Sequence, residues 1–311
     1  MNTLQTVHTT DIVNTIGGEE LINRFLANID TKPKTKDTYR KALKQFNSFI
    51  TENGITQTER AHILQYKAFL TANYSASTVS AYLTAVKQFY KWLEAEKIYP
   101  NITAGIKGAK QSKGHKKDTL TIDQAKELLQ SFEKKTIEQL RDFAIINLLI
   151  RTGLRTIEIE RANIEDIRQE AGQSLLYIQG KGRDTKDDFV KLTPATLKPI
   201  QAYLIARGET DGKKPLFASE SNRTKGDRLT TRSIRRIVKE SLRSIGIDSE
   251  KITAHSLRHT AVTFSLLGGA TIQEAQAMAR HSNINTTLIY AHNIDRIQNG
   301  AENKIDSFLS A

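Results

Sequence analysis

The chain has 311 residues, of which 38% are hydrophobic, so it is long enough for two domains that each bury a core. It has no cysteine, which excludes disulfides, a cysteine nucleophile and any zinc site that uses cysteine. The net charge of +12 favours a polyanionic partner. No segment approaches the ~18 apolar residues of a membrane span, and the polar N-terminus is not a signal peptide, so we expect a cytoplasmic protein with no membrane partner.

The positive charge is concentrated in the first third of the chain. Residues 1–117 carry 17 Lys and Arg against 9 Asp and Glu, whereas residues 118–311 carry 29 against 25. We interpret this excess as a nucleic-acid-binding surface, with simple solubility as the alternative. The first 17 residues have no strong apolar period and predict a flexible tail.

Residues 18–105 predict a small bundle of helices. Apolar residues recur there at helical spacing in four segments, which are residues 19–29, 35–54, 58–73 and 75–97. Gly54 marks the end of the second segment, and Pro100 follows the fourth. Each segment has one apolar face to bury, so the four together indicate a bundle.

The fourth of these helices has a polar face that suits DNA. Small hydroxyls and lysines on one helix are typical of contacts with phosphates along a groove, although an ordinary solvated face is the alternative. The candidate DNA-binding residues on this helix are Ser75, Ser77, Thr78, Lys87 and Lys91.

Residues 106–117 predict a basic linker between two domains. The stretch "KGAKQSKGHKK" has five lysines, two glycines and no acidic residue, and its apolar residues follow no period. A basic linker between two basic domains is what a clamp around a duplex needs. Its candidate DNA contacts are Lys110, Lys113, Lys116 and Lys117.

Residues 118–311 predict a second domain in which helices surround a small sheet. Thr121 and Gln124 form a capping pattern, and a buried helix over residues 138–153 ends at Gly153. Between residues 164 and 192 the apolar period shifts towards two, which predicts a short β-hairpin or meander. Helical patterns resume at residues 194–206, 230–246, 256–269 and 271–280. The expected fold class is mainly α with a small antiparallel β-sheet: a helical bundle, then an α+β domain.

Three stretches of this second domain carry single reactive residues that are unremarkable in isolation. "RTGLRTIEIE" places Arg155 after a glycine turn, and "QGKGRDTKDDF" places Lys181 between two glycines. Either cation alone reads as an ordinary surface residue. "HSNINTTLIYAH", residues 281–292, places Tyr290 nine residues after His281, and Tyr290 alone reads as a packing residue.

A fourth stretch, "TAHSLRHTAV", is more specific. His255, Arg258 and His259 share one side at the start of a helix, where the backbone N–H groups and the helix dipole favour an anion. A zinc pair of the H-E-x-x-H type would need glutamate directly after the first histidine, and Ser256 occupies that position. Arg258 would also repel a cation, so the cluster favours a phosphate over a metal.

In this order the four stretches resemble the tyrosine site-specific recombinases, also called phage-type integrases. That family has an arginine in a TGLR turn, a lysine in a GKG hairpin, an H-x-L-R-H box and a histidine-to-tyrosine segment, which match "TGLR", "GKG", "HSLRH" and "HSNINTTLIYAH" here. The layout resembles the two-domain Xer type, with residues 18–105 as core-DNA-binding domain and 118–311 as catalytic domain. One departure is Arg280, where the family often has glycine, and we expect it to contact a phosphate or to alter the turn.

The resemblance implies a recombinase that cleaves and rejoins DNA strands through a 3′-phosphotyrosyl intermediate, with no metal, ATP or other cofactor. Two arginines neutralise the phosphate, two histidines add hydrogen bonds, a lysine protonates the leaving 5′ oxygen and a tyrosine attacks phosphorus. In that order the implied residues are Arg155 and Arg258, His255 and His281, Lys181, and the nucleophile Tyr290. Glu158 and Asp166 are expected to orient the arginines.

The implied partner is double-stranded DNA with paired inverted binding sites, held by a homotetramer that spans two such sites. The exchange would integrate, excise or resolve a DNA element, for example a mobile element. Two alternatives are a non-cleaving DNA-binding protein on the same fold, which has little reason to keep all six polar groups, and a related topoisomerase, which needs no tetramer. After Tyr290, an apolar set predicts a segment that docks on a neighbouring subunit or on its own domain: Ile294, Ile297, Ile305, Phe308 and Leu309.

Overall fold

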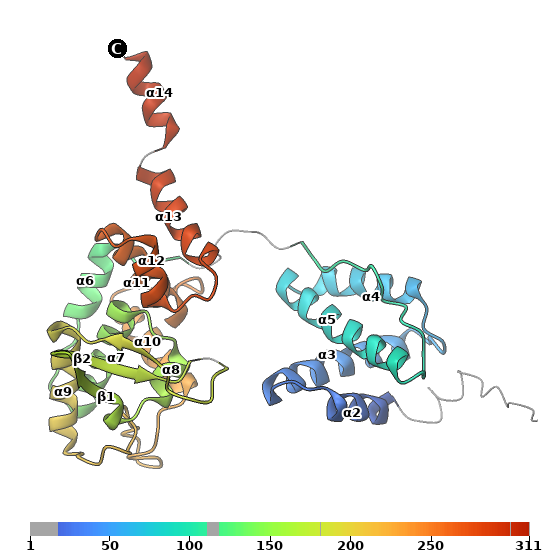
Figure 1. Cartoon of the computed structure of the whole chain (residues 1–311), viewed down its shortest axis with the longest axis horizontal. Coiled ribbons are helices and arrows are strands. Elements are labelled where there is room, and N and C mark those ends of the chain that lie inside the picture. The colour runs from blue at the N-terminus through green and yellow to red at the C-terminus, as the bar shows by residue number, and fades with distance from the viewer. Residues whose placement is uncertain (1–17, 111–117, 181, 299, 311) are drawn as a thin grey trace, which may run out of the picture. The chain divides into compact units, whose positions relative to one another are not determined.

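The computed structural model describes residues 18–110, 118–180, 182–298 and 300–310 (Figure 1). The chain divides into two compact units, with the division between residues 113 and 114. The predicted tail and four of the candidate site residues lie outside the described residues: Lys113, Lys116, Lys117 and Lys181. Within the described ranges, no helix is long and apolar enough to cross a membrane.

The first unit is the predicted bundle of helices. Its helices are α2 (Gly18–Asn28), α3 (Pro33–Glu52), α4 (Arg60–Asn73) and α5 (Ala76–Ala95). Each helix buries an apolar face, and Phe25, Leu43, Tyr66 and Val86 meet in one core. The face expected for α4 included Leu64, but Leu64 is 48% exposed, and α4 instead buries Ile63, Tyr66 and Leu70. The bundle therefore forms because each amphipathic helix removes its apolar face from water by packing against the others.

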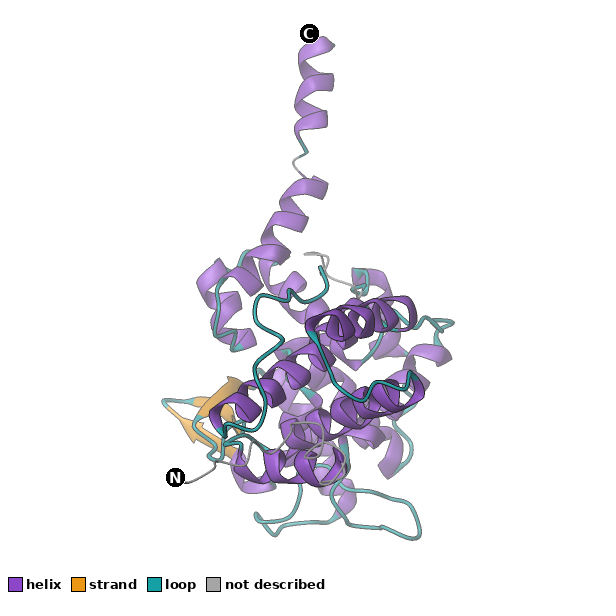
Figure 2. Ribbon diagram, turned by 90° about the vertical axis from the view of Figure 1, so that its right-hand side faces the viewer, coloured by secondary structure: helices purple, strands orange, loops and turns teal. Residues whose placement is uncertain are grey.

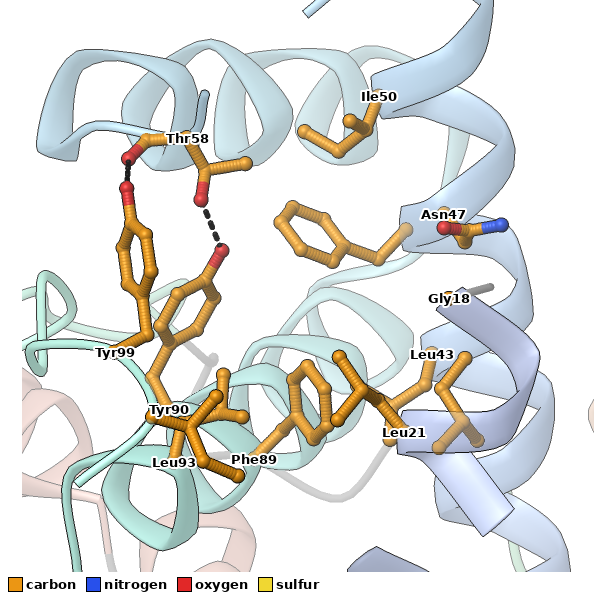
Figure 3. Close-up of a pocket in the computed structure, with 13 residues that line it drawn as sticks. Gly18, Leu21, Leu43, Asn47, Ile50, Thr58, Phe89, Tyr90, Leu93 and Tyr99 are labelled. Atoms are coloured by element: carbon orange, nitrogen blue, oxygen red, sulfur yellow. Dashed lines mark hydrogen bonds between the residues drawn. The ribbon is translucent and has the colours of Figure 1, made fainter. Parts of the chain in front are cut away.

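An apolar pocket of about 80 Å³ lies in this core, between α2, α3 and α5 (Figure 3). At one side of it the Tyr99 hydroxyl donates to the Thr58 carbonyl oxygen at 2.5 Å, and the Tyr90 hydroxyl donates to Thr58 Oγ1 at 2.7 Å. These bonds satisfy two buried phenols and tie the segment before α4 to α5. Its described lining has no charged side chain, so the pocket belongs to the core of the bundle.

The second unit consists mostly of helices, with one small sheet at its edge, as Figure 2 shows. The helices are α6 (Ile122–Gln130), α7 (Ile137–Thr152), α8 (Thr156–Arg161), α9 (Pro194–Arg207), α10 (Thr231–Ser244), α11 (Ala254–Leu267), α12 (Ile272–Ala279), α13 (Asn285–Gln298) and α14 (Ala301–Leu309). The antiparallel sheet has the order β1 (Ile167–Glu170), β2 (Gln173–Ile178) and β3 (Asp188–Lys191). The predicted fold class, mainly α with a small antiparallel sheet, is confirmed.

Helix α7 is the centre of the second unit. It is apolar nearly all round, and α9 and α11 both pack against it. It ends at Gly153, as predicted, because Gly153 adopts φ +61°, a left-handed conformation that favours glycine. A Cβ at this position would also stand 3.3 Å from the Cβ of Ala261. The close approach of this turn to α11 brings the residue after it, and then Arg155, beside Arg258.

The loop between β2 and β3, residues 179–187, contains the position of Lys181. Two contacts tie its described residues to the rest of the unit. The Lys186 ammonium pairs with the buried Asp166 carboxylate at 2.5 Å, and Arg161 donates to the Gly180 carbonyl oxygen at 3.2 Å. Asp166 is thus a structural support, but it holds a lysine where an arginine partner was expected.

Candidate active site

Arg155 occupies the N-cap of α8, directly after the turn at Gly153. Its Nη1 donates to Glu158 Oε1 at 2.8 Å, and its backbone N–H donates to Glu158 Oε2 at 2.7 Å. The side chain of Arg155 is 30% exposed, whereas that of Glu158 is fully buried. Glu158 therefore fixes one edge of the guanidinium from inside and leaves the remaining donors available to an anion at the surface.

Arg258 lies in the first turns of α11 and is buried. Its Nη1 donates to the carbonyl oxygen of Gly153 at 2.5 Å and its Nη2 to that of Ala279, so it joins the turn before Arg155 to the end of α12. Burial lowers the pKa of Arg258 to about 9, and the charges of Arg155 and Arg280 act in the same direction. The guanidinium stays protonated at neutral pH and concentrates positive charge below the surface.

Tyr290 lies in α13 and is 4% exposed. It packs against Val262 of α11 and Ala279 of α12. Burial raises the pKa of the Tyr290 hydroxyl to about 12, although the charge of Arg258 opposes that rise. The phenol is therefore neutral near pH 7 and needs a base before it can act as a nucleophile.

Two histidines contact this tyrosine, and a third contacts one of them. Nδ1 of His259 shares a hydrogen bond with the Tyr290 hydroxyl, and the exposed His255 ring meets the His259 ring edge-on with centroids 4.4 Å apart. The His281 ring stacks on Tyr290 with centroids 6.3 Å apart, and its Nδ1 lies 2.9 Å from Thr287 Oγ1. The described residues contain no group of three or more His, Asp or Glu placed to hold a metal ion.

His259 is the residue that the sequence did not assign to the site. Its signal was present, because it follows His255 by four residues and directly follows Arg258. That spacing predicts a shared helix face and a phosphate-binding cluster, but it does not predict a separate role for His259. The contact with Tyr290 depends on how α13 packs on α11, which no local pattern reveals.

Arg280 follows α12 and adopts φ +54° and ψ +48°, the left-handed conformation. Its side chain is 7% exposed, and its Nη2 donates to Glu158 Oε2 at 2.9 Å. Burial lowers the pKa of Arg280, while the charge of Glu158 opposes that change. The sequence predicts a phosphate contact or an altered turn at this position, and the burial favours a role inside the protein over direct contact with DNA.

The candidate DNA contacts of the first unit have varied surroundings. Ser75 caps α5, and its Oγ lies 3.0 Å from both Ser77 Oγ and Thr78 Oγ1, so these hydroxyls form one cluster at the helix N-terminus. The Lys87 ammonium donates to the Ile106 carbonyl oxygen and is thus engaged with its own chain. The side chains of Lys91 and Lys110 are exposed. Contact of any of these residues with DNA stays a prediction.

The structure brings together five of the six predicted catalytic residues. They lie at the N-terminus of α8, in the first turns of α11, after α12 and in α13, and they are Arg155, His255, Arg258, His281 and Tyr290. Lys181 lies outside the described residues. The arrangement combines two arginines, a buried phenol and imidazoles, which is chemistry suited to a phosphodiester.

The comparisons with known proteins agree with this chemistry. Residues 118–296 match the phage integrase family, and residues 21–99 match the phage integrase N-terminal SAM-like domain. Tyrosine recombinase XerC of Pelobacter propionicus is 31% identical over 288 residues, which cover 89% of this chain and 92% of that protein. Tyrosine recombinase XerA of Pyrococcus furiosus is 32% identical over 276 residues, which cover 87% of this chain and 88% of that protein.

Solved structures share the fold. XerH recombinase bound to a palindromic difH substrate, in a post-cleavage complex, has a TM-score of 0.74 at 22% identity, over 94% of this chain and 86% of that chain. A lambda integrase dimer bound to a COC′ core site has a TM-score of 0.68 at 16% identity, over 86% of this chain and 96% of that chain. The fold, the family match and the XerC and XerA relatives all agree: the chain belongs to the phage integrase family and is a tyrosine recombinase, an enzyme of the class that transfers DNA strands.

Proposed function

We propose that Tyr290 is the nucleophile of this recombinase. Its hydroxyl oxygen attacks phosphorus, the bond from phosphorus to the 5′ oxygen breaks, and a 3′-phosphotyrosyl link forms beside a free 5′-hydroxyl. The reverse attack by a 5′-hydroxyl of another strand rejoins the DNA, so the bond energy is conserved and no ATP is needed. The observation that carries the proposal is the position of the Tyr290 hydroxyl, which is bonded to His259 and lies within the field of Arg258.

Arg155 and Arg258 are the proposed clamp for the scissile phosphate. A phosphodiester carries one negative charge, and the five-coordinate transition state carries two, so a pair of fixed guanidiniums gains strength as the reaction proceeds. Arg155 is partly exposed and keeps free donors, while Arg258 is held by two carbonyl oxygens from below. This asymmetry supports direct contact by Arg155 and close electrostatic support by Arg258.

His259 is the proposed first acceptor for the Tyr290 proton. A neutral phenol with a pKa of about 12 must lose that proton as it attacks, and His259 Nδ1 is already bonded to it. His255 is exposed and touches the His259 ring, so we keep it as the candidate that hydrogen-bonds the phosphate and exchanges protons with solvent. His281 stacks on Tyr290 and is the proposed second hydrogen-bonding histidine.

Lys181 is the proposed acid for the leaving 5′ oxygen, which needs a proton once it is released. An isolated lysine has a pKa of about 10.4 and donates slowly at neutral pH, so the role requires burial or nearby cations that lower the pKa. The loop that contains position 181 is held at Gly180 by Arg161 and at Lys186 by Asp166. These two contacts fix described residues on both sides of position 181, which supports the proposal.

Double-stranded DNA with paired inverted sites is the proposed partner, bound in the cytoplasm by a homotetramer that integrates, excises or resolves a DNA element.

Helix α14 supports such an assembly, because it exposes three apolar side chains that a neighbouring copy can cover. They are Ile305, Leu309 and Phe308, and Phe308 is 82% exposed. An open pocket of about 410 Å³ lies between α6, α7 and α11, with Ile122, Leu129 and Phe264 in its wall. We propose that α14 of one copy docks in this pocket of the next. Lambda integrase, similar in fold at 16% identity, is known as a tetramer on a Holliday junction.

Covalent trapping tests the proposed nucleophile. A duplex with inverted arms is first selected by binding to the wild-type protein from a pool of randomised DNA. A nicked version of it then serves as a suicide substrate, because the short 5′-hydroxyl fragment diffuses away after cleavage and leaves the adduct trapped. Wild type is expected to form an adduct that survives detergent, while Tyr290→Phe binds the same duplex and forms none. Tyr177→Phe, in the sheet, is the matched control that keeps the adduct. An adduct from Tyr290→Phe would refute the assignment.

A further inference from the structure

One buried carboxylate holds two arginines that come from distant parts of the chain. Glu158 Oε1 accepts from Arg155 Nη1, and Glu158 Oε2 accepts from the Arg155 backbone N–H and from Arg280 Nη2. Glu158 and Arg155 belong to the start of α8, whereas Arg280 stands between α12 and His281. The side chain of Glu158 is fully buried, so its carboxylate oxygens receive their hydrogen bonds from these donors and not from solvent.

The backbone at Arg280 is strained in a way that its side chain offsets. Its φ of +54° lies in the left-handed region, which glycine adopts freely and which costs other residues energy. An arginine at such a position persists when the surrounding structure holds it there. Two contacts do so: Nη2 pairs with Glu158 and Nη1 donates to the Met278 carbonyl oxygen at 2.5 Å.

We propose that Arg280 is a positioning residue for DNA cleavage, which acts through Glu158 to fix the orientation of Arg155 relative to the segment that begins at His281. The inference rests on the proposed phosphate-binding role of Arg155. Arg280 itself does not touch the phosphate, because its side chain is buried against Glu158. Its effect is to keep the carboxylate in place and ionised, so that the carboxylate in turn holds the Arg155 guanidinium.

The same short segment also reaches the second arginine of the clamp. Arg258 Nη2 donates to the carbonyl oxygen of Ala279, the residue directly before Arg280. The side chain at position 280 therefore reaches Arg155 through Glu158. Arg258 instead contacts the backbone oxygen of Ala279, and glycine at position 280 leaves that contact in place because glycine adopts the left-handed conformation freely. Arg155 is thus linked to Arg280 through Glu158, and Arg258 is bonded to Ala279. These two neighbouring residues come directly before His281, whose ring stacks on Tyr290.

Neighbouring positive charges explain why the buried carboxylate of Glu158 stays ionised. Burial acts to raise the pKa of Glu158, but the charge of Arg280 and the hydrogen bonds from Arg155 outweigh it, and the pKa lies below its ordinary value. The other charged groups that face the cluster are Arg258 of α11, whose charge interacts with Glu158, and Asp188 of β3, which acts on Arg280. If Arg280 is removed, the effect of burial gains weight and the pKa of Glu158 rises.

The test compares Arg280→Gly and Arg280→Lys with wild type on the nicked selected duplex, under single-turnover conditions from pH 5 to pH 8. Glycine relieves the backbone strain and removes the ion pair. We expect Arg280→Gly to bind the duplex as wild type does but to form the adduct about tenfold more slowly, because a misplaced clamp loses rate without losing ground-state contacts. The acid limb of its rate profile shifts to higher pH as the pKa of Glu158 rises. Arg280→Lys keeps the positive charge but can make only one of the two contacts of Arg280. It should therefore recover part of the rate and reverse part of the shift of the acid limb.

Two controls separate this mechanism from a general loss of structure. Ala171→Gly relieves a left-handed backbone of φ +48° in the β1–β2 turn and leaves the rate and the pH profile unchanged. In a Glu158→Gln background, Arg280→Gly causes no further loss, because its effect passes through the carboxylate.

Three outcomes would overturn the inference. They are an Arg280→Gly variant with the wild-type rate and pH profile, an independent loss in the Glu158→Gln background, and, if the glycine variant does not fold, an Arg280→Lys variant with an unshifted acid limb. In each of these cases wild type still forms its adduct, so the proposed function stands. A wild-type protein that forms no adduct would instead overturn both proposals.

Discussion

The hydroxyl of Tyr290 is hydrogen-bonded to Nδ1 of His259, a residue of the neighbouring helix α11 that lies 31 positions earlier in the chain. The contact pairs a phenol whose pKa is raised to about 12 with an imidazole that can accept its proton. It also joins α13 to the helix that carries Arg258. The phenol, the imidazole and the buried guanidinium of Arg258 are therefore held by two helices that pack together.

The first prediction concerns that contact. His259→Asn keeps a polar side chain at the buried position but removes the base, so adduct formation should slow on the order of 10²-fold while DNA binding is unchanged. Single-turnover trapping on the nicked duplex measures the rate, and a filter or gel assay measures the affinity. His292→Asn, an exposed histidine of α13, is the matched control and should react as wild type. Wild-type kinetics from His259→Asn would exclude a role in proton removal.

A second prediction follows from the lowered pKa of Glu158. Because its pKa in the folded protein lies below the unfolded value of about 4.5, its ionised form stabilises the fold at all pH values above that range, and this contribution is lost as pH falls through the folded pKa. Glu158→Gln leaves Arg155 and Arg280 without their charged partner and should lower the free energy of unfolding by about 3 kcal/mol at pH 7. Urea titrations at pH 7 and pH 4 should show a smaller deficit at pH 4. A deficit that grows on acidification would contradict the ion-pair account.

A third prediction tests the proposed role of Lys181 by changing the leaving group of the DNA substrate. Lys181→Ala should cleave ordinary DNA slowly, because the departing 5′ oxygen lacks its proton donor. A substrate with sulfur in place of that bridging oxygen needs less protonation, so it should recover most of the lost rate. Arg183→Ala removes an exposed arginine of the same loop and should react normally with both substrates. Equal deficits of Lys181→Ala on oxygen and on sulfur would assign the proton to another group.

The proposed assembly is tested at α14. Replacing Phe308 and Leu309 with serine removes the apolar side chains that we expect to fill the pocket of a neighbouring copy. Sedimentation with the selected duplex should then detect single protomers or dimers on DNA and no tetramer. Lys304→Ser, on the same helix and also exposed to solvent, should leave the tetramer intact. If the double serine variant still forms tetramers, α14 does not hold the assembly together.

Local patterns predicted much of this molecule. Apolar spacing located the helices of the first unit, the capping box of Thr121 and Gln124 is present at the start of α6, and Gly153 ends α7. The order of the four motifs anticipated that Arg155, Arg258 and Tyr290 meet. Each of these features depends on residues close in sequence or on a motif with a fixed structural context.

The remaining features depend on tertiary packing. Nothing near Arg280 in the sequence reveals that its side chain turns inward to Glu158, which lies 122 residues earlier in the chain. The sequence predicts that Lys87 is an exposed cation, but in the structure its ammonium donates to the carbonyl oxygen of Ile106, in the segment after α5. The bond between His259 and Tyr290 likewise requires two helices to pack at a particular register. A long polar side chain can reach many partners, and only the folded chain selects among them.

The identity of the residue that becomes linked to DNA is the central claim. The adduct formed by wild type on the nicked duplex can be digested with protease and nuclease, and mass spectrometry then locates the remaining nucleotide on a peptide. The account predicts a single modified residue, Tyr290, joined through its phenol oxygen to a 3′-phosphate. A nucleotide on any other residue, or a link to a 5′-phosphate, would contradict it.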